Sequence, residues 1–354
     1  MFTFTIRKKI LLSFGILVLL LVAVGFISHD SLQANKSSLS VLVNDIQPAM
    51  EQSFKIVDQL DRASASLGFY LLSKEELHKK AYLSNMSSLT VSVKALGDMS
   101  IVKKDPATMT LVKNVSVELT KLQSFKDQMI GYASDDSKNM PAMKFAGVEV
   151  NPRAQTILQN LQEMIQSESS EKASDERRQL LLDIYGLRTN FANSMNELRL
   201  FLAFRQDATK ANLKVYMELV NNDLAKLNKY DPNVLTFEQQ PALENINKVF
   251  KEWNVAADKL VKIHGAEDWR QDAFVIRKDL SPLVLQIQER LNTLVKNQQN
   301  ASVQSSQKLT TQVQRTQNTV GGLIVLGLVS ALLIGWILSR AITRPINVLK
   351  DNAY

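Results

Sequence analysis

The feature that most constrains this chain is a pair of uncharged apolar runs, one near each end. The first extends from Ile10 to Ile27 and the second from Val320 to Leu338. Each run is close to the ~20 residues that an apolar helix needs to cross a hydrocarbon core about 30 Å thick. The sequence therefore predicts two membrane-spanning helices, joined by a long segment that lies on one side of the membrane.

Basic residues beside the two runs predict which side that is. Arg7–Lys9 stand just before the first run, and Arg340 and Arg344 follow the second. Because Lys and Arg favour the cytoplasmic side, both termini are expected inside the cell and the segment between the runs outside it. The expected division is 1–9 cytoplasmic, 10–28 first span, 29–318 outer domain, 319–339 second span and 340–354 cytoplasmic.

A cleaved signal peptide is the alternative for the first run. The run has a basic segment before it, and Ala23–Gly25 resembles a small-residue cleavage site. The apolar run continues through Phe26 and Ile27 beyond that site, which favours a membrane span.

The formal net charge of +7 does not predict a nucleic-acid-binding surface. Six of the 42 Lys and Arg residues and one of the 35 Asp and Glu residues flank the apolar runs, so the rest of the chain carries only +2. The basic excess is therefore mostly a topology signal. Cysteine is absent, which excludes disulfides and suits a periplasmic domain of a bacterial protein.

The outer segment is expected to be helical nearly throughout, since no strand-like alternation of useful length appears. Two sequences match a capping box, Ser73–Glu76 and Thr236–Gln239, and His264-Gly265 is typical of a helix end. A capping residue before proline marks further helix starts, at Asp105-Pro106, Asn151-Pro152 and Asp231-Pro232. The expected helices are 31–72, 75–97, 106–134, 152–169, 174–229, 237–263 and 268–318, with a break near Arg205–Asp207 left open and a loop at Asp135–Asn151.

Apolar residues in these helices step by three or four, as on the core face of bundle helices. The clearest stripe is Leu180, Ile184, Leu187, Phe191, Met195, Leu198 and Leu202. A faint repeat relates residues 68–83 to 200–217, each a hairpin tip followed by a return helix, although chance similarity of two amphipathic hairpins is the alternative. The predicted fold class is all-α, between two transmembrane helices; if the repeat is real, it suggests two four-helix units, which would form two stacked four-helix bundles.

Directly after the second run, Ile342-Thr343-Arg344-Pro345-Ile346 followed by Leu349 resembles the opening of a HAMP linker, the dimeric helical relay of bacterial transmembrane sensors. The outer domain resembles the helical bimodular sensor domain of methyl-accepting chemotaxis proteins over about residues 30–318. The resemblance implies two stacked four-helix bundles, a homodimer in the bacterial inner membrane, small organic acids as typical ligands and an output domain beyond Tyr354. Related double-bundle domains occur in sensor histidine kinases, where a periplasmic binding protein can be the partner.

The second run gives a separate reason to expect a dimer. Gly327, Ala331 and Gly335 recur every four residues and form a stripe on which another helix can approach closely. The Gln-rich stretch at 298–317 is too weakly apolar to stand alone. The last helices and second spans are therefore expected near a twofold axis or against the first span.

Catalytic and metal chemistry find little support in the sequence. Of the three histidines, His29 abuts the membrane, His78 lies on a charged helix face and His264 begins a loop, and no two share the spacing of a helical metal site. No Gly-rich phosphate loop or nucleophile motif appears. The chain is predicted not to be an enzyme and to need no cofactor and no metal.

If the outer domain binds a small carboxylate, it needs a guanidinium group with hydroxyl or amide donors nearby. The candidate ligand-binding residues are Arg188 with Thr189 and Asn193 as auxiliary donors, Arg62, Arg199 and Arg205.

Each candidate has a surface or structural alternative. Asp58 lies one turn before Arg62, which favours an ion pair within the helix. Arg188 and Arg199 lie ~16 Å apart along one helix, too far to hold one small acid together. Arg205 stands at a position of the helix that would face the core, which is unusual for an arginine unless the helix ends there. Arg188 lacks an acid one turn away and is expected to point into a pocket between helices.

The leading hypothesis is the sensing and relay portion of a chemoreceptor, in which a ligand outside shifts the second span toward the HAMP segment. The first alternative is the sensor region of a histidine kinase or a cyclic-dinucleotide enzyme. The second is a membrane-anchored structural module without a ligand.

Overall fold

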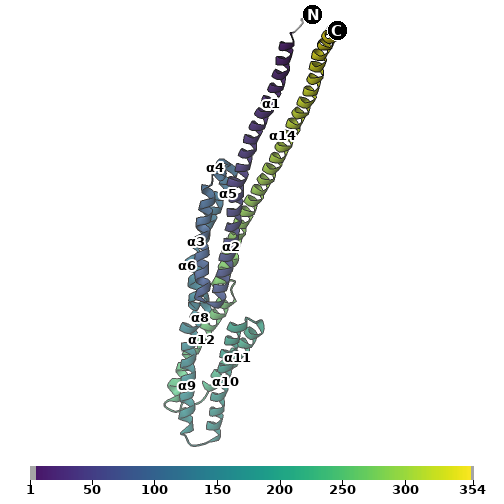
Figure 1. The fold of residues 1–354 in the computed structure, drawn as a ribbon. Helices are drawn as coiled ribbons and strands as arrows, with labels where there is room; N and C mark the ends of the chain where they lie inside the picture. Colours follow the sequence, from purple (N-terminus) through teal and green to yellow (C-terminus); the bar gives the residue numbers. More distant parts are fainter. Residues whose placement is uncertain (1–4, 352–354) are drawn as a thin grey trace. The chain divides into compact units, whose positions relative to one another are not determined.

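The computed structural model describes residues 5–351, which are almost entirely helical and contain no strand (Figure 1). The elements are α1 (Ile6–Val41), the π-helical η1 (Leu42–Ile46), α2 (Gln47–Ser73), α3 (Glu76–Asp98), α4 (Ser100–Lys104), α5 (Pro106–Ser124), α6 (Lys126–Ser134), α7 (Asp136–Asn139), α8 (Pro141–Phe145), η2 (Ala146–Val150), α9 (Asn151–Ser169), α10 (Asp175–Phe204), α11 (Asp207–Leu227), α12 (Gln239–Gly265), α13 (Gln271–Val275), η3 (Ile276–Leu280) and α14 (Ser281–Asp351). The all-α fold class is confirmed.

The chain divides into two compact units. The first contains Met1–Arg62, Ser84–Leu119 and Gln286–Tyr354. Its buried side chains come from four chain segments, including Ile56 of α2, Leu89 of α3, Val115 of α5 and Leu294 of α14. These segments form the four-helix arrangement that the apolar periodicity predicts.

Polar contacts link the same segments of the first unit. The Gln52 amide donates to the Ser92 carbonyl oxygen at 3.0 Å, and the Arg290 guanidinium pairs with Glu118 at 2.7 Å. Nearer the ends of the chain, α1 and α14 contact each other through Thr316, whose hydroxyl donates to Ser31 at 2.8 Å. At this level α14 therefore lies beside the helix that carries the first apolar run.

Two helical stretches are long and apolar enough to cross a membrane, within Ile10–Ser73 and Gln271–Arg340. None of the most apolar window of either is buried inside the protein. A core helix of a soluble protein would bury that window, so these exposed surfaces suit a hydrocarbon environment better than water.

The second unit contains Ala63–Leu83 and Thr120–Leu285. Its largest core cluster is built from α8, η2 and α9–α12. Trp253 lies at the centre, fully buried, with its ring centroid 4.9 Å from Phe191 and 6.0 Å from Phe250. The predicted stripe on α10 is buried from Leu180 to Leu198, and only its last member, Leu202, is partly exposed.

The expected loop at Asp135–Asn151 is wrong, because that segment is mostly helical. The Asp135 carboxylate caps α7 by accepting from the Ser137 N–H at 2.9 Å. Pro141 then begins α8, which continues through η2 into α9. Asn151-Pro152 therefore lies within a continuous helix and is not a helix start.

Of the other predicted helix starts, two have the expected side-chain cap and two do not. Asp105 caps α5 through the N–H groups of residues 107 and 108, as expected. Thr236 and Gln239 form the reciprocal capping box, at 3.0 and 3.1 Å. The capping box predicted at Ser73–Glu76 is not formed. Ser73 is the last residue of α2, and its hydroxyl accepts from the Glu75 N–H instead of the Glu76 N–H. Asp231-Pro232 begins a turn instead of a helix.

The three π-helical segments share a sequence pattern that was not predicted. Each ends one residue before an Xaa-Pro pair and reads acidic, aliphatic, any residue, proline. The three sequences are Asp45-Ile46-Gln47-Pro48, Glu149-Val150-Asn151-Pro152 and Asp279-Leu280-Ser281-Pro282. In each, the residue before proline donates its N–H to the carbonyl five residues earlier. The wider turn gives room for a proline ring, which would otherwise crowd the carbonyl four residues before it.

Candidate functional site

Arg62 is held by an ion pair within its own helix. Its Nε lies 2.8 Å from Asp58, and both side chains are more than half exposed. The ion-pair alternative for this residue is confirmed, and the pair is of the surface type that contributes little to stability.

The structure places the Arg188 group away from any described cavity. Arg188, Thr189 and Arg199 are exposed on α10, and Asn193 is half-buried. Since Leu187 faces the core, the next residue along the helix is turned about 100° away from it. The pocket between helices expected around Arg188 is therefore wrong.

Arg205 is the candidate that the structure places at a cavity. Helix α10 ends there, because Arg205 adopts a left-handed conformation with φ 55° and ψ 30°. The helix end that was expected from the core-facing position of Arg205 is therefore confirmed. One terminal nitrogen, Nη2, donates to the carbonyl oxygens of Gly265 and Ala266 at 3.2 and 3.4 Å. The guanidinium carbon lies 4.6 Å from the centre of the Trp269 indole ring.

His264 packs behind Arg205 and is almost fully buried, with 1% of its surface exposed. Its ring meets Trp269 edge-to-face at 4.9 Å and Phe201 edge-to-face at 5.6 Å. Burial lowers the pKa of His264, the positive charge of Arg205 lowers it further, and the Leu202 carbonyl acts in the opposite direction. Neither ring nitrogen has a hydrogen-bond partner of acceptable geometry. The expectation that His264 begins a loop is wrong, since it lies inside the last turn of α12.

Arg277 completes this corner of the second unit. It belongs to η3, and its Nη2 donates to the Glu267 carbonyl oxygen at 3.0 Å. Together with Arg205, Trp269 and residues 265–267 it lines an open cavity of about 420 Å³. Within the described residues neither guanidinium pairs with a carboxylate; Arg277 is exposed to solvent and Arg205 is half-buried. We call this the Arg205–Arg277 cavity.

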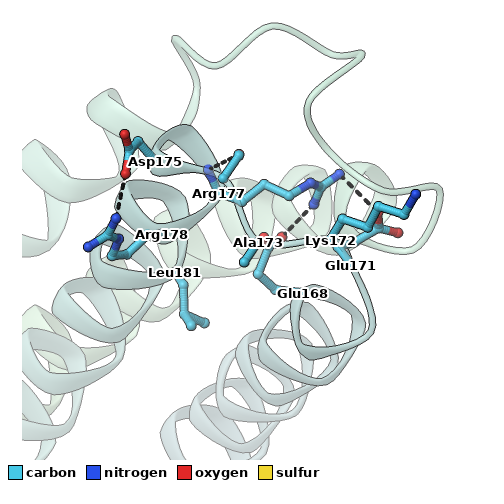
Figure 2. A pocket seen from close by; sticks show the side chains of 9 residues that line it. Glu168, Glu171, Lys172, Ala173, Asp175, Arg177, Arg178 and Leu181 are labelled. Atoms are coloured by element: carbon cyan, nitrogen blue, oxygen red, sulfur yellow. Dashed lines mark hydrogen bonds and ion pairs between the residues drawn. The ribbon is translucent and has the colours of Figure 1, made fainter.

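A second cavity of about 530 Å³ lies at the turn between α9 and α10. Figure 2 shows the Arg177 side chain reaching from α10 toward Glu168 of α9 and Glu171 of the turn that follows it. Arg177 lies 2.9 Å from Glu168 and 3.5 Å from Glu171, and Arg178 pairs with Asp175. Every arginine of this cavity therefore has its own carboxylate.

The buried Glu168 carboxylate also accepts a hydrogen bond from the Gln239 amide at 2.8 Å. Arg177 in turn donates to the Val234 carbonyl oxygen at 3.1 Å. These contacts tie α9, α10 and the start of α12 together. The α9–α10 cavity is thus explained as a structural junction whose charges are already satisfied.

A third cavity of about 600 Å³ lies between η2–α9 and α12. Its arginine, Arg153, is held by Glu149 at 2.7 Å and Glu252 at 3.4 Å. Lys259 lies 5.0 Å from the Phe145 ring centre. Of the three described cavities, the Arg205–Arg277 cavity is the one whose guanidinium groups lack a carboxylate partner.

Comparison with known protein families identifies the class of domain. The family described as a four helix bundle sensory module for signal transduction matches residues 3–180, about half of the chain. The chain belongs to this family. No curated protein sequence matches it.

The matched range of the sensory module extends from α1 into α10. The first compact unit, however, is completed by Gln286–Tyr354, which lie outside that range. In this sensory module the bundle that contains the first apolar helix is therefore closed by the last helix of the chain. The family is a sensory one, and in residues 5–351 no group of three His, Asp or Glu side chains could hold a metal ion.

Arg205 was among the predicted ligand-binding residues, whereas its neighbours in the cavity, Trp269 and Arg277, were not. Arg277 was overlooked because Lys278 and Asp279 follow it, which is typical of a solvated helix face. Trp269 could have indicated this corner of the fold, because a large indole side chain between two predicted helices needs a packing partner. In the sensory module that partner is the Arg205 guanidinium.

Proposed function

We propose that this sensory module is the ligand-sensing and relay portion of a bacterial chemoreceptor in the inner membrane. A small molecule such as an organic acid binds the periplasmic domain, and the second span passes the change to the HAMP segment. The observation that supports the relay is α14, which runs without a break from Ser281 to Asp351 and includes the apolar run Val320–Leu338. A ligand that favours one of two positions of such a helix changes the position of its far end.

A homodimer is part of this proposal. The small-residue stripe of the second apolar run is open in the monomer, because a Cβ added at Gly327 or Gly335 would meet nothing within 4 Å. An uncovered stripe of this kind allows close approach of a second helix in a membrane.

The topology can be tested by single-cysteine labelling, since the chain has no cysteine of its own. Lys172 is exposed at the α9–α10 turn, and Lys8 is exposed before the first apolar run. We expect Lys172→Cys to react with a membrane-impermeant maleimide in intact bacteria. Lys8→Cys should react only after the membrane is permeabilised. Labelling of Lys8→Cys from outside, or protection of Lys172→Cys, would overturn the membrane assignment and the sensor function with it.

A further inference from the structure

The core of the first unit contains a small number of buried polar groups. Among its described residues, the polar or charged side chains that are buried are Ser53, Ser92, Glu118 and Gln298. Glu118 pairs with Arg290 at 2.7 Å. The other three carry no charge, and each belongs to a different helix, α2, α3 and α14. Because buried polar groups are ordinarily hydrogen-bonded, these three need an explanation.

Two contacts give the height of Gln298 along the bundle. Gln288 donates to Asp61 at 2.7 Å, and Gln312 accepts from Ser38 at 3.5 Å. These pairs show that α14 runs antiparallel to α1 and α2. Gln298 lies between the two contacts, about 15 Å along the helix axis from Gln288. It is therefore level with the second turn of α2.

Ser53 and Ser92 lie at the same height. Ser53 belongs to the second turn of α2, and the amide of its neighbour Gln52 donates to the Ser92 carbonyl oxygen of α3 at 3.0 Å. The exposed fractions of Ser53, Ser92 and Gln298 are 0%, 4% and 7%, so all three side chains face the shared core. We call these three residues the polar layer.

Apolar layers lie on both sides of the polar layer. One turn away along α2 in either direction the buried residues are Ile46 and Ile56, and the neighbouring turns of α3 bury Leu96 and Leu89. Displacing α14 by one turn would therefore set the Gln298 amide beside apolar side chains. The residues of α14 that precede Gln298 on its buried face are apolar as well, namely Leu283, Ile287, Leu291, Leu294 and Val295.

Within the polar layer, the Gln298 amide has acceptors close to its level. Both of its polar atoms are buried, and neither bonds a described residue. The Ser53 hydroxyl donates to the Ala49 carbonyl oxygen at 2.8 Å. A hydroxyl that donates one hydrogen bond can still accept others.

We propose that Gln298 is a positioning residue, which fixes the height of α14 in the first unit. A rotation of the glutamine side chain lets its amide donate to the serine hydroxyls of the polar layer, and the adjacent layers offer no buried polar side chain. A single buried polar residue sets the register of packed helices in this way, at a cost in stability. The importance of this register for signalling rests on the proposed function, because α14 is the relay helix.

The test measures the register of α14 by disulfide formation in the full chain in lipid nanodiscs, since the chain has no cysteine of its own. The Thr316 hydroxyl donates to Ser31 at 2.8 Å, so Ser31→Cys with Thr316→Cys reports the described register. Ser31→Cys with Gln312→Cys or with Val320→Cys reports a displacement of one turn, because residues four apart share a helix face. Gel mobility separates bonds within one chain from bonds between chains.

In the parent, the cysteine pair at Ser31 and Thr316 should cross-link at least about tenfold faster than either displaced pair, the factor that an unpaired buried amide costs in population. Gln298→Leu should raise both displaced rates toward that of the aligned pair. The same substitution should raise the melting temperature, because it removes a buried polar group from an apolar core. Gln299→Leu is the matched control, since Gln299 is exposed, and it should keep the preference of the parent.

A second variant tests the partners of the amide. Ser53→Ala combined with Ser92→Ala should loosen the register as Gln298→Leu does. It should lower the melting temperature instead of raising it, because the amide stays buried and loses its acceptors. The same change in register with opposite changes in melting temperature distinguishes a hydrogen-bonded layer from altered packing.

Three results would overturn the inference: no preference for the aligned pair in the parent, an unchanged preference in Gln298→Leu, or an unchanged preference in the double serine variant. None of them affects the labelling of Lys172→Cys and Lys8→Cys, which tests the sensor function separately. Conversely, labelling of Lys8→Cys from outside would refute the sensor function and leave the polar layer in place.

Discussion

At the scale of single residues, the second unit shows two ways of burying polar groups. Glu168 is almost fully buried, and its carboxylate accepts from both Arg177 and Gln239. His264 is also buried, but neither ring nitrogen has a hydrogen-bond partner of acceptable geometry among the described residues, and its ring packs against Phe201, Trp269 and the Arg205 charge. A buried charge is tolerated when it is paired and hydrogen-bonded, whereas an unpartnered buried imidazole favours the neutral form.

His264 therefore predicts a loss of stability on acidification. Its pKa in the folded state is lowered by burial and by Arg205, so the unfolded chain takes up a proton first as the pH falls. Above the unfolded value near 6.5 both states are neutral, and the free energy of unfolding does not depend on this group. Below that value the free energy of unfolding should decrease until the folded-state pKa is passed.

The measurement is the melting temperature of the full chain at pH 7.5 and pH 5.5. His264→Phe keeps an aromatic ring between Phe201 and Trp269, so it should lose less stability at the lower pH than the parent does. His78→Phe is the control, because it leaves His264 in place and should retain the pH dependence of the parent. Equal pH dependence in His264→Phe and the parent would contradict the assignment.

At the scale of elements, the helices depend on a small number of side-chain caps. The box at the start of α12 is reciprocal, since the side chains of Thr236 and Gln239 each accept from the other's backbone N–H. The Thr236 hydroxyl also lies 2.6 Å from the Ser167 hydroxyl of α9. The cap thus holds the helix start and joins it to a neighbouring helix.

Replacing Thr236 with valine removes the hydroxyl and keeps the branched shape of the side chain. We expect Thr236→Val to lower the free energy of unfolding by about 1 kcal/mol, the usual cost of a lost N-cap. The matching fall in melting temperature is about 2–4 °C for a unit of this size. Thr189→Val on the exposed face of α10 has no cap to lose and should change stability by less than about 0.5 kcal/mol. An equal effect of the two substitutions would show that the cap is unimportant.

At the scale of the whole molecule, the stretch from the end of α1 through η1 into α2 has more apolar surface than the monomer covers. Leu32, Leu39, Val43 and Phe54 lie on one face and are 69%, 48%, 45% and 48% exposed. Their spacing of 7, 4 and 11 residues returns to the same side of a helix. This face is separate from the one that carries Ser31 and Ser38 toward α14.

We expect this face to be the parallel contact of the proposed homodimer. Val43→Cys should form a disulfide-linked dimer in membranes under mild oxidation. Val41→Cys is the matched control: Val41 is 43% exposed but points to the opposite side of the same helix. Cross-linking of both at the same rate, or of neither, would argue against a dimer through this face.

The sequence predicted the helices well and the cavity poorly, for physical reasons. Long amphipathic stripes such as Leu180–Leu198 determine a helix and its buried face, because only one side can be apolar. The segment 135–151 was mistaken for a loop because Pro141, Gly147 and Pro152 usually interrupt helices, whereas here η2 accommodates Pro152. The Arg205–Arg277 cavity joins Arg205, at the end of α10, to the segment 265–277, about 60 residues further along the chain. The spacing of residues within one helix does not predict such a contact between distant parts of the chain.

The three proline-linked bulges bear on how this chain can change over evolutionary time. One codon inserted into a regular α-helix rotates everything beyond it by about 100° and turns the buried face toward solvent. A π-bulge confines the extra residue to a single turn, so Ile46, Val150 and Leu280 stay buried despite it. The segments before Pro48, Pro152 and Pro282 are therefore places where related genes can gain or lose a codon without rebuilding a helix. Length differences among relatives should gather there.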